Sequence, residues 1–193
     1  MTLQDNGGAA RNITPRVMRE LLDYFPETGK FTWKIREEKW FKDTLERNAR
    51  HSCNIWNSKF SGKEAFTSCD KYGYKKTAIL NVKCQAHRVA WKIFYGYEPE
   101  FDIDHINTDK SDNRISNLRE ATRGQNQRNH NRRSDNTSGC KGVSFDKKSG
   151  KYHAYIRSGG KRTSLGFYAT PELAHEAYKL AATRIHGEYK NYG

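Results

Sequence analysis

The stretch that most constrains this chain is residues 101–129, where a short alternating run leads through a polar loop to a helix. Two apolar residues, Phe101 and Ile103, alternate with two aspartates, and this spacing predicts a brief half-buried strand. Residues 107–116 are rich in Asp, Asn and Ser, which predicts a loop rather than a core element. A strand, a loop and a helix in this order can bring distant polar side chains to one small site.

The helix after the loop has a recognisable start. Thr122 and Gln125 fit a capping box, in which the Gln125 side chain reaches back to the Thr122 amide. Asn126 then falls in the first helical turn, and His130 follows one turn later on the same face.

Four side chains of this stretch point to chemistry, and they are Asp104, His105, Asn117 and Asn126. Carboxylate and amide oxygens are hard ligands that suit Mg²⁺ or Mn²⁺. An imidazole that is neutral near pH 7 can take a proton from an attacking water. Neighbouring strand residues point to opposite faces, so the strand must end or twist if both of its polar side chains are to reach one phosphate. The alternative is a plain polar loop whose Asn and Asp residues serve turns and caps.

These four residues resemble the motif of the His-Asn-His (HNH) nucleases, in the branch whose last His is replaced by Asn. The resemblance extends upstream through residues 86–91, Ala-His-Arg-Val-Ala-Trp. It also takes in residues 22–24, Leu-Asp-Tyr, with residues 27–30, Glu-Thr-Gly-Lys, which are typical of phage-borne members.

The resemblance implies an α+β fold with a ββα-metal site that cuts DNA with one divalent cation. Asp104 and Asn126 would hold the metal, with His130 as an alternative ligand, because the last motif position departs from His. His105 and Asn117 would be the catalytic residues, His105 as the general base and Asn117 as the side chain that orients it.

The net charge and the cysteine content limit which class of protein this chain can belong to. The net charge of +13 is spread along all 193 residues, which favours a long polyanion such as double-stranded DNA over a membrane patch. No apolar run is long enough for a bilayer span, and the polar residues 1–10 are expected to be a disordered leader without a signal peptide. The expected location is therefore the cytoplasm. A structural zinc on His51, Cys53, Cys69 and Cys84 is not expected, because these residues lack the usual ligand spacing.

From residue 139 the pattern changes to short alternating runs. Residues 141–145, 151–157 and 161–168 predict three strands, and Thr170 with Pro171 starts a helix. Tyr152, Ile156, Leu165 and Phe167 are expected to cover this helix, which should present Ala174, Ala177, Tyr178, Ala181, Ala182 and Ile185 to the sheet.

This three-strand and helix unit resembles the AP2 DNA-binding domain. The resemblance rests on Lys-Gly-Val at 141–143, Tyr-x-Ala-x-Ile-Arg at 152–157, Leu-Gly-Phe-Tyr at 165–168 and Glu-x-Ala-x-x-Ala-Tyr at 172–178. It implies a small three-stranded antiparallel sheet that lies in the major groove of DNA. The matching positions are Lys141, Lys151, His153, Tyr155, Arg157, Arg162 and Ser164.

The sequence therefore predicts a metal-dependent homing endonuclease of a phage or other mobile element. Its parts are a leader at 1–10, an HNH nuclease domain at 11–133, a linker at 134–138 and an AP2-like domain at 139–193. Further DNA contacts are expected from His87, Arg88, Arg128, Arg132 and Arg133, although His87 could equally cap or pack, and residues 134–138 could be a plain solvated linker. A homodimer on DNA is left open. The alternatives are a non-catalytic DNA-binding regulator with a vestigial nuclease fold and an RNA-directed or structural nucleic-acid protein.

Overall fold

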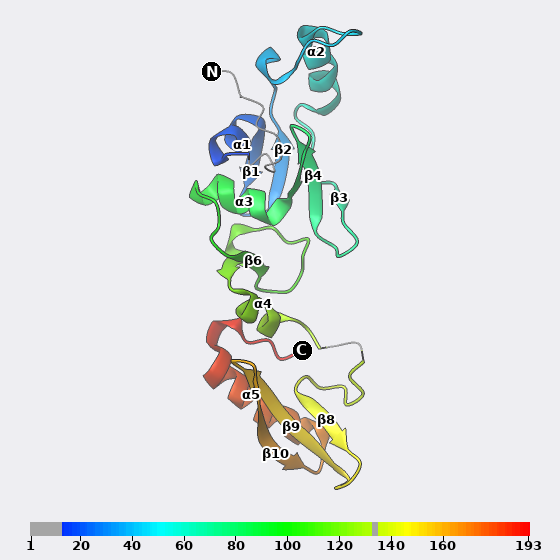
Figure 1. Ribbon diagram of the computed structural model, residues 1–193, viewed down its shortest axis with the longest axis vertical. Helices are drawn as coiled ribbons and strands as arrows, with labels where there is room; N and C mark the ends of the chain where they lie inside the picture. Colours follow the sequence, from blue (N-terminus) through cyan, green and yellow to red (C-terminus); the bar gives the residue numbers. More distant parts are fainter. Residues whose placement is uncertain (1–12, 133–134) are drawn as a thin grey trace. The chain divides into compact units, whose positions relative to one another are not determined.

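The computed structural model of the chain describes residues 13–132 and 135–193. The expected leader at 1–10 and the predicted DNA contact Arg133 lie outside the described residues. The described chain forms two compact units, one made of the residues up to 105 together with 109–119, and the other of 106–108 together with 120–193. Both units mix helices with small sheets, as Figure 1 shows.

The first unit contains most of the secondary structure. Its elements are α1 (Pro15–Leu21), β1 (Leu22–Phe25), β2 (Lys30–Trp33), η1 (Glu38–Trp40), α2 (Ala49–Phe60), β3 (Ser68–Cys69), β4 (Lys75–Ile79), β5 (Val82–Gln85), α3 (Ala86–Tyr95), β6 (Asp102–His105), η2 (Ile115–Asn117) and β7 (Leu118–Ala121), whose last two residues fall in the second unit. The strands form a β1–β2 hairpin, a β3–β4–β5 sheet and a β6–β7 pair.

The core of the first unit forms where α1, α3 and the β1–β2 hairpin meet. Thr14 caps α1 and Pro15 occupies its first position, as the sequence predicts. Met18 and Leu21 are buried beside Phe31, and the Phe31 ring lies 4.7 Å from that of Phe66. Leu22 is buried as expected, but it begins the strand β1 rather than extending the helix.

Helix α2 departs most from what the sequence indicates, because residues 36–50 show no assignable pattern and residues 54–65 look like a loop. The Asn48 side chain caps the helix by accepting a hydrogen bond from the His51 amide at 2.8 Å. Trp56 and Phe60 pack against the core, and the guanidinium of Arg36 lies 3.7 Å from the Trp56 ring centroid. Few apolar residues pack α2 against the core, so the spacing of apolar residues that predicts a helix cannot be recognised in this polar segment.

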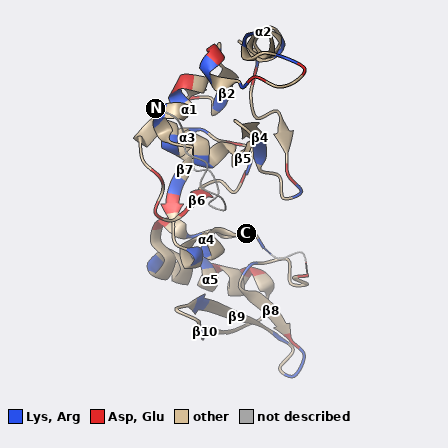
Figure 2. Cartoon of the chain, turned by 45° about the horizontal axis from the view of Figure 1, so that its top comes forward, with Lys and Arg blue, Asp and Glu red and all other residues tan. Residues whose placement is uncertain are grey.

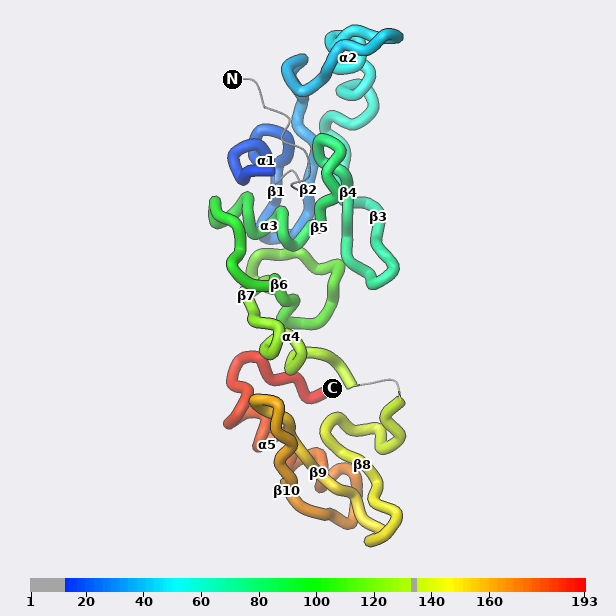
Figure 3. The backbone as a smooth tube through the Cα atoms, in the orientation of Figure 1, coloured from blue at the N-terminus to red at the C-terminus, as the bar shows by residue number. Residues whose placement is uncertain are grey.

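Strand β6 also differs from the prediction. A half-buried strand was expected, yet Ile103, Asp104 and His105 are all buried. The strand is therefore enclosed on both faces, and successive side chains that point in opposite directions can both be internal. Figure 3 traces the chain as it leaves β6, makes the wide polar loop and returns as β7.

The second unit contains α4 (Arg123–Asn129), β8 (Val143–Asp146), β9 (Lys151–Ser158), β10 (Lys161–Tyr168), α5 (Pro171–His186) and η3 (Gly187–Tyr189). The three strands form an antiparallel sheet in the order β10–β9–β8, and α5 packs against it through Ala174, Tyr178 and Ala182. The predicted strands and helix of this region are confirmed. Ile185, which was expected on the packed face, is exposed.

A β-bulge in β10 explains why Phe167 does not cover α5 as predicted. The pairing with β9 shifts between Ser164 and Gly166, which leaves Leu165 as the extra residue. Leu165 packs against α5, and the alternation restarts after it, so Phe167 emerges on the opposite face with 51% of its surface exposed. Phe94 of α3 is likewise exposed. No helix among residues 13–132 and 135–193 has the length and apolar character needed to cross a bilayer.

Candidate active site

Strand β6 presents Asp104 and His105 next to each other in the interior of the first unit. Their exposed fractions are 5% for Asp104 and 4% for His105. Burial of two ionisable side chains is costly unless each has polar partners. The partners of these two side chains therefore define the candidate site.

Asp104 is held by an arginine from the paired strand β7. The Oδ2 atom of Asp104 accepts hydrogen bonds from Arg119 Nε at 3.0 Å and from Arg119 Nη2 at 2.8 Å. Both side chains are largely buried, so this charge-assisted contact fixes the orientation of the carboxylate. Arg119 was not among the predicted site residues, because a single arginine in a basic chain carries no local mark of this contact.

His105 is oriented by the side-chain amide of Asn113, which was also not among the predicted site residues. The Nε2 atom of His105 lies 3.4 Å from Oδ1 of Asn113, a side chain that is only 1% exposed. The Nδ2 atom of Asn113 donates to the carbonyl of Ser111 at 3.0 Å, which turns the amide oxygen toward the imidazole. An acceptor at this position favours the His105 tautomer that carries its proton on Nε2 and its lone pair on Nδ1.

The polar loop is braced from within and from the β1–β2 hairpin. The Nδ2 atom of Asn117 donates to the carbonyl of Asp112 at 2.8 Å, and the hydroxyl of Tyr24 donates to the carbonyl of Asn113 at 2.8 Å. Gly29 has a φ of +69° and lies against the backbone of this loop. A Cβ atom on residue 29 would be only 2.5 Å from the backbone nitrogen of Arg114. Gly29 and Tyr24 of the β1–β2 hairpin therefore hold the loop that carries Asn113 in place.

Two aromatic rings enclose His105. The His87 ring on α3 lies 5.2 Å from the His105 ring in an edge-on arrangement. The ring of Tyr74, the residue before β4, lies 5.0 Å from that of His87 and 5.9 Å from that of His105. His87 is 5% exposed, and its Nδ1 atom has no hydrogen-bond partner among the described residues. His87 therefore packs beside His105, which favours the packing alternative over the predicted contact with a DNA phosphate.

Burial keeps both imidazoles neutral. Burial lowers the pKa of His105, while the Asn113 contact and the charges of Asp104, Asp109 and Asp112 oppose this effect. For His87, burial and the neighbouring His105 lower the pKa to about 3. A neutral His105 can accept a proton at physiological pH, which is what a general base requires.

The residues predicted to bind a metal come from both units. Asp104 belongs to the first unit, whereas Asn126 lies in the first turn of α4, whose capping box of Thr122 and Gln125 is confirmed. Helix α4 ends at Asn129, and His130 has extended backbone angles, so His130 does not share a helical face with Asn126 as was expected. No cluster of three or more His, Cys, Asp and Glu side chains occurs in the described part of the chain. A carboxylate such as that of Asp104 and an amide oxygen such as that of Asn126 are each the kind of donor that a hard cation prefers.

The predicted DNA-contacting residues of the C-terminal sheet share one face. Lys151, His153, Tyr155 and Arg157 alternate along β9 on the side opposite Ala154 and Ile156, which face α5. Arg162 pairs with Arg157 across β10, and Ser164 pairs with Tyr155. The guanidinium of Arg162 lies 3.7 Å from the Tyr155 ring, and His153 stacks on Phe167 at 4.5 Å. This surface, the outer face of the β8–β10 sheet, carries both cations and aromatic rings.

The other predicted DNA contacts are placed differently. Lys141 is half-buried, and its ammonium group donates to backbone carbonyls rather than extending into solvent, which argues against the predicted DNA contact. Arg88 forms an ion pair with Glu98 at 3.0 Å. Arg132 is exposed and Arg128 is partly exposed. Figure 2 marks the lysines and arginines of both units in blue.

Comparison with known families supports the nuclease interpretation for the central part of the chain. Residues 84–128 match a family model described as HNH endonuclease. The matched segment runs from β5 into α4 and includes Asp104, His105, Asn117 and Asn126. No curated protein and no solved structure matches the chain. The similarity to HNH endonucleases supports nuclease activity for this part of the chain.

Proposed function

We propose that this protein is a metal-dependent DNA endonuclease that hydrolyses a phosphodiester bond with a water activated by His105. The observation that carries the proposal is a buried imidazole next to an arginine-bound carboxylate, inside the segment similar to HNH endonucleases. A base that stays unprotonated at neutral pH can remove the proton of an attacking water.

In the proposed mechanism, Asp104 would bind one divalent cation, Mg²⁺ or Mn²⁺, and Asn126 is the second ligand that the resemblance to the HNH nucleases implies. When bound, such a cation polarises a phosphoryl oxygen and stabilises the departing alkoxide. The Nε2 atom of His105 faces Asn113, so the Nδ1 atom of His105 is the nitrogen that takes the proton from water. Asn117 acts on His105 by holding the polar loop through its bond to the Asp112 carbonyl.

We further propose that the C-terminal module, residues 139–193, directs the nuclease to its target. The outer face of the β8–β10 sheet offers Lys151, Arg157 and Arg162 to phosphates, with His153 and Tyr155 available to base edges and sugars. A two-stranded or three-stranded ribbon of this size can enter the major groove. Separate targeting of this kind suits a homing endonuclease, because it raises the effective concentration of the cleavage site near one sequence.

The proposal is tested by incubating the purified protein with supercoiled plasmid in Mg²⁺ and in EDTA. Nicking or linearisation that requires Mg²⁺ is the expected result, and a parallel incubation with duplex RNA should give no cleavage. DNA binding without cleavage in Mg²⁺ or Mn²⁺ would instead favour a non-catalytic regulator, and preferential cleavage of RNA would favour an RNA-directed nuclease.

A further inference from the structure

Helix α4 is too short to be stable by itself. It has seven residues, whereas isolated helices need roughly 12 or more before they are even marginally populated in water. Its N-terminus is satisfied locally by the capping box of Thr122 and Gln125. Its C-terminus has no glycine cap, because His130 leaves the helix in an extended conformation, so the last carbonyls must find donors elsewhere.

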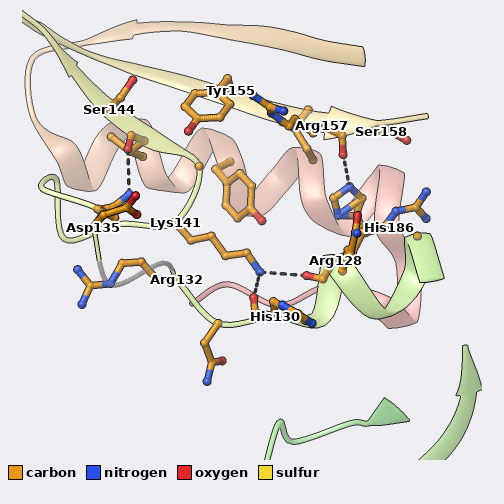
Figure 4. Close-up of a pocket in the computed structure, with 18 of the residues that line it drawn as sticks. Arg128, His130, Arg132, Asp135, Lys141, Ser144, Tyr155, Arg157, Ser158 and His186 are labelled. Atoms are coloured by element: carbon orange, nitrogen blue, oxygen red, sulfur yellow. Dashed lines mark hydrogen bonds between the residues drawn. The ribbon is translucent and has the colours of Figure 1, made fainter. Parts of the chain in front are cut away.

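Those donors come from the C-terminal module. The Nζ atom of Lys141 donates to the carbonyl of Arg128 at 3.0 Å and to that of His130 at 2.5 Å, and Figure 4 shows the lysine reaching across to both. The Nδ2 atom of Asn191 donates to the carbonyl of Asn129 at 2.6 Å. Three successive carbonyls at the end of α4 are thus each bonded to a residue beyond position 139.

A fourth bond holds the segment that enters α4. The hydroxyl of Tyr189 donates to the carbonyl of Glu120 at 3.0 Å, two residues before the capping threonine. The anchors are themselves tied to helix α5. The carbonyl of Lys141 lies 3.1 Å from Nδ1 of His175, and the hydroxyl of Tyr178 donates to the carbonyl of Asn191 at 3.4 Å. The position of α4 is therefore fixed at both ends by the fold of the C-terminal module.

The chemistry of Lys141 fits an anchor better than a phosphate contact. A cation near the C-terminal carbonyls of a helix is stabilised by the helix dipole. Burial lowers the pKa of Lys141 to about 8, which a solvent-exposed lysine on DNA would not experience. Two carbonyl acceptors offset part of that burial cost.

We propose that Lys141, Tyr189 and Asn191 are positioning residues for cleavage, because they set the place of α4 and of Asn126, the cation ligand that it carries. This inference rests on the proposed function, in which Asn126 is a ligand of the divalent cation. The C-terminal module is then part of the cleavage machinery as well as the targeting element.

Uncharged variants of the full-length protein give the cleanest test, because they remove an anchor without altering the electrostatics of DNA binding. The double variant Tyr189→Phe/Asn191→Ala loses two of the anchoring donors. Its matched control is Asn54→Ala, an exposed asparagine of α2. For the charged anchor, Lys141→Gln is compared with Lys148→Gln, which removes the same charge from an exposed turn, and Lys141→Arg should restore part of the function.

Three measurements separate positioning from simple loss of folding. The single-turnover cleavage rate at saturating protein should fall about tenfold or more in the double variant, since small misplacements near reacting groups carry large rate penalties. The dissociation constant for duplex DNA in EDTA should stay within about twofold of wild type, because no phosphate contact is lost. Mn²⁺ affinity, measured directly by electron paramagnetic resonance without DNA, should weaken.

The outcomes distinguish this inference from the proposed function. If wild type binds Mn²⁺ and cleaves, and the double variant matches it in both, the inference is overturned while the function stands. Equal losses of DNA affinity, Mn²⁺ affinity and thermal stability would also overturn it, because the anchors would then serve folding alone. A wild-type protein that neither binds Mn²⁺ nor cleaves would overturn the proposed function and this inference with it.

Discussion

The Nε2 atom of His105 lies 3.4 Å from the Oδ1 atom of Asn113, and the Asn113 amide is oriented by a second hydrogen bond to the Ser111 carbonyl. This relationship assigns the tautomer of the proposed general base. It also makes Asn113 the side chain through which the loop acts on the imidazole, four residues before the motif residue Asn117.

Asn113→Asp should therefore shift the pH dependence of cleavage. A carboxylate beside Nε2 stabilises the imidazolium and raises the pKa of His105, so the acidic limb of the rate profile should move to higher pH. Single-turnover rates measured from pH 5 to pH 9 check this, with Asn54→Asp as the control at an exposed position. An unmoved acidic limb in Asn113→Asp would contradict the assigned contact.

Removal of either member of the Asp104–Arg119 ion pair should cost stability, because the other charge is then buried without its partner. Breaking a buried pair typically costs about 3 kcal/mol or more. The double variant Asp104→Asn/Arg119→Met should lose less free energy of unfolding than the two single variants lose in sum, as measured by urea unfolding. Arg16→Met, which breaks the exposed Arg16–Glu20 pair at 3.5 Å, should change little. Additive losses in the double variant would show that the two side chains are not coupled.

Acid should destabilise the protein partly through His87. Its pKa in the folded protein is about 3, below the ordinary value of 6.5, so the unfolded chain binds a proton that the folded chain excludes. This contribution to stability is complete above about pH 6.5 and is lost as the pH falls toward 3. His87→Gln should be less stable at pH 7 but lose less stability between pH 7 and pH 4.5 than wild type. Parallel pH curves for the two proteins would rule out this role of His87.

Arg157→Gln should weaken DNA binding through the outer face of the β8–β10 sheet. Loss of one phosphate contact should reduce the slope of log affinity against log salt by about one. Arg184→Gln, on the exposed part of α5, is the charge-matched control and should leave the slope closer to wild type. Equal slopes for the two variants would mean that the sheet face is not the DNA-contacting surface.

Local capping and turn signals predicted much of the fold. They did not predict the side-chain contacts between residues that are far apart in the sequence. Thr14, Thr122 and Thr170 were found as helix caps because the signal lies within four residues. Phe167 was misplaced because a single bulge residue inverts the faces of a strand.

For the candidate site, the sequence identified the motif residues but not the side chains that orient them. Asp104 and His105 are neighbours in sequence and are buried together, which a motif can identify. Asn113 and Arg119 act through contacts made by a folded loop and a strand pair, and one Asn or Arg among many carries no local mark. The role of Lys141 was likewise hidden, because a lysine in a basic chain is indistinguishable from a DNA contact until its carbonyl partners are known.

The central claim is that His105 activates the water that cuts DNA. The direct test is single-turnover cleavage by His105→Ala, with DNA affinity in EDTA measured on the same preparation and His51→Ala as the exposed-histidine control. The account predicts that His105→Ala binds DNA almost as tightly as wild type yet cleaves it at no detectable rate, while the control does both normally. Cleavage by His105→Ala at the wild-type rate would contradict it.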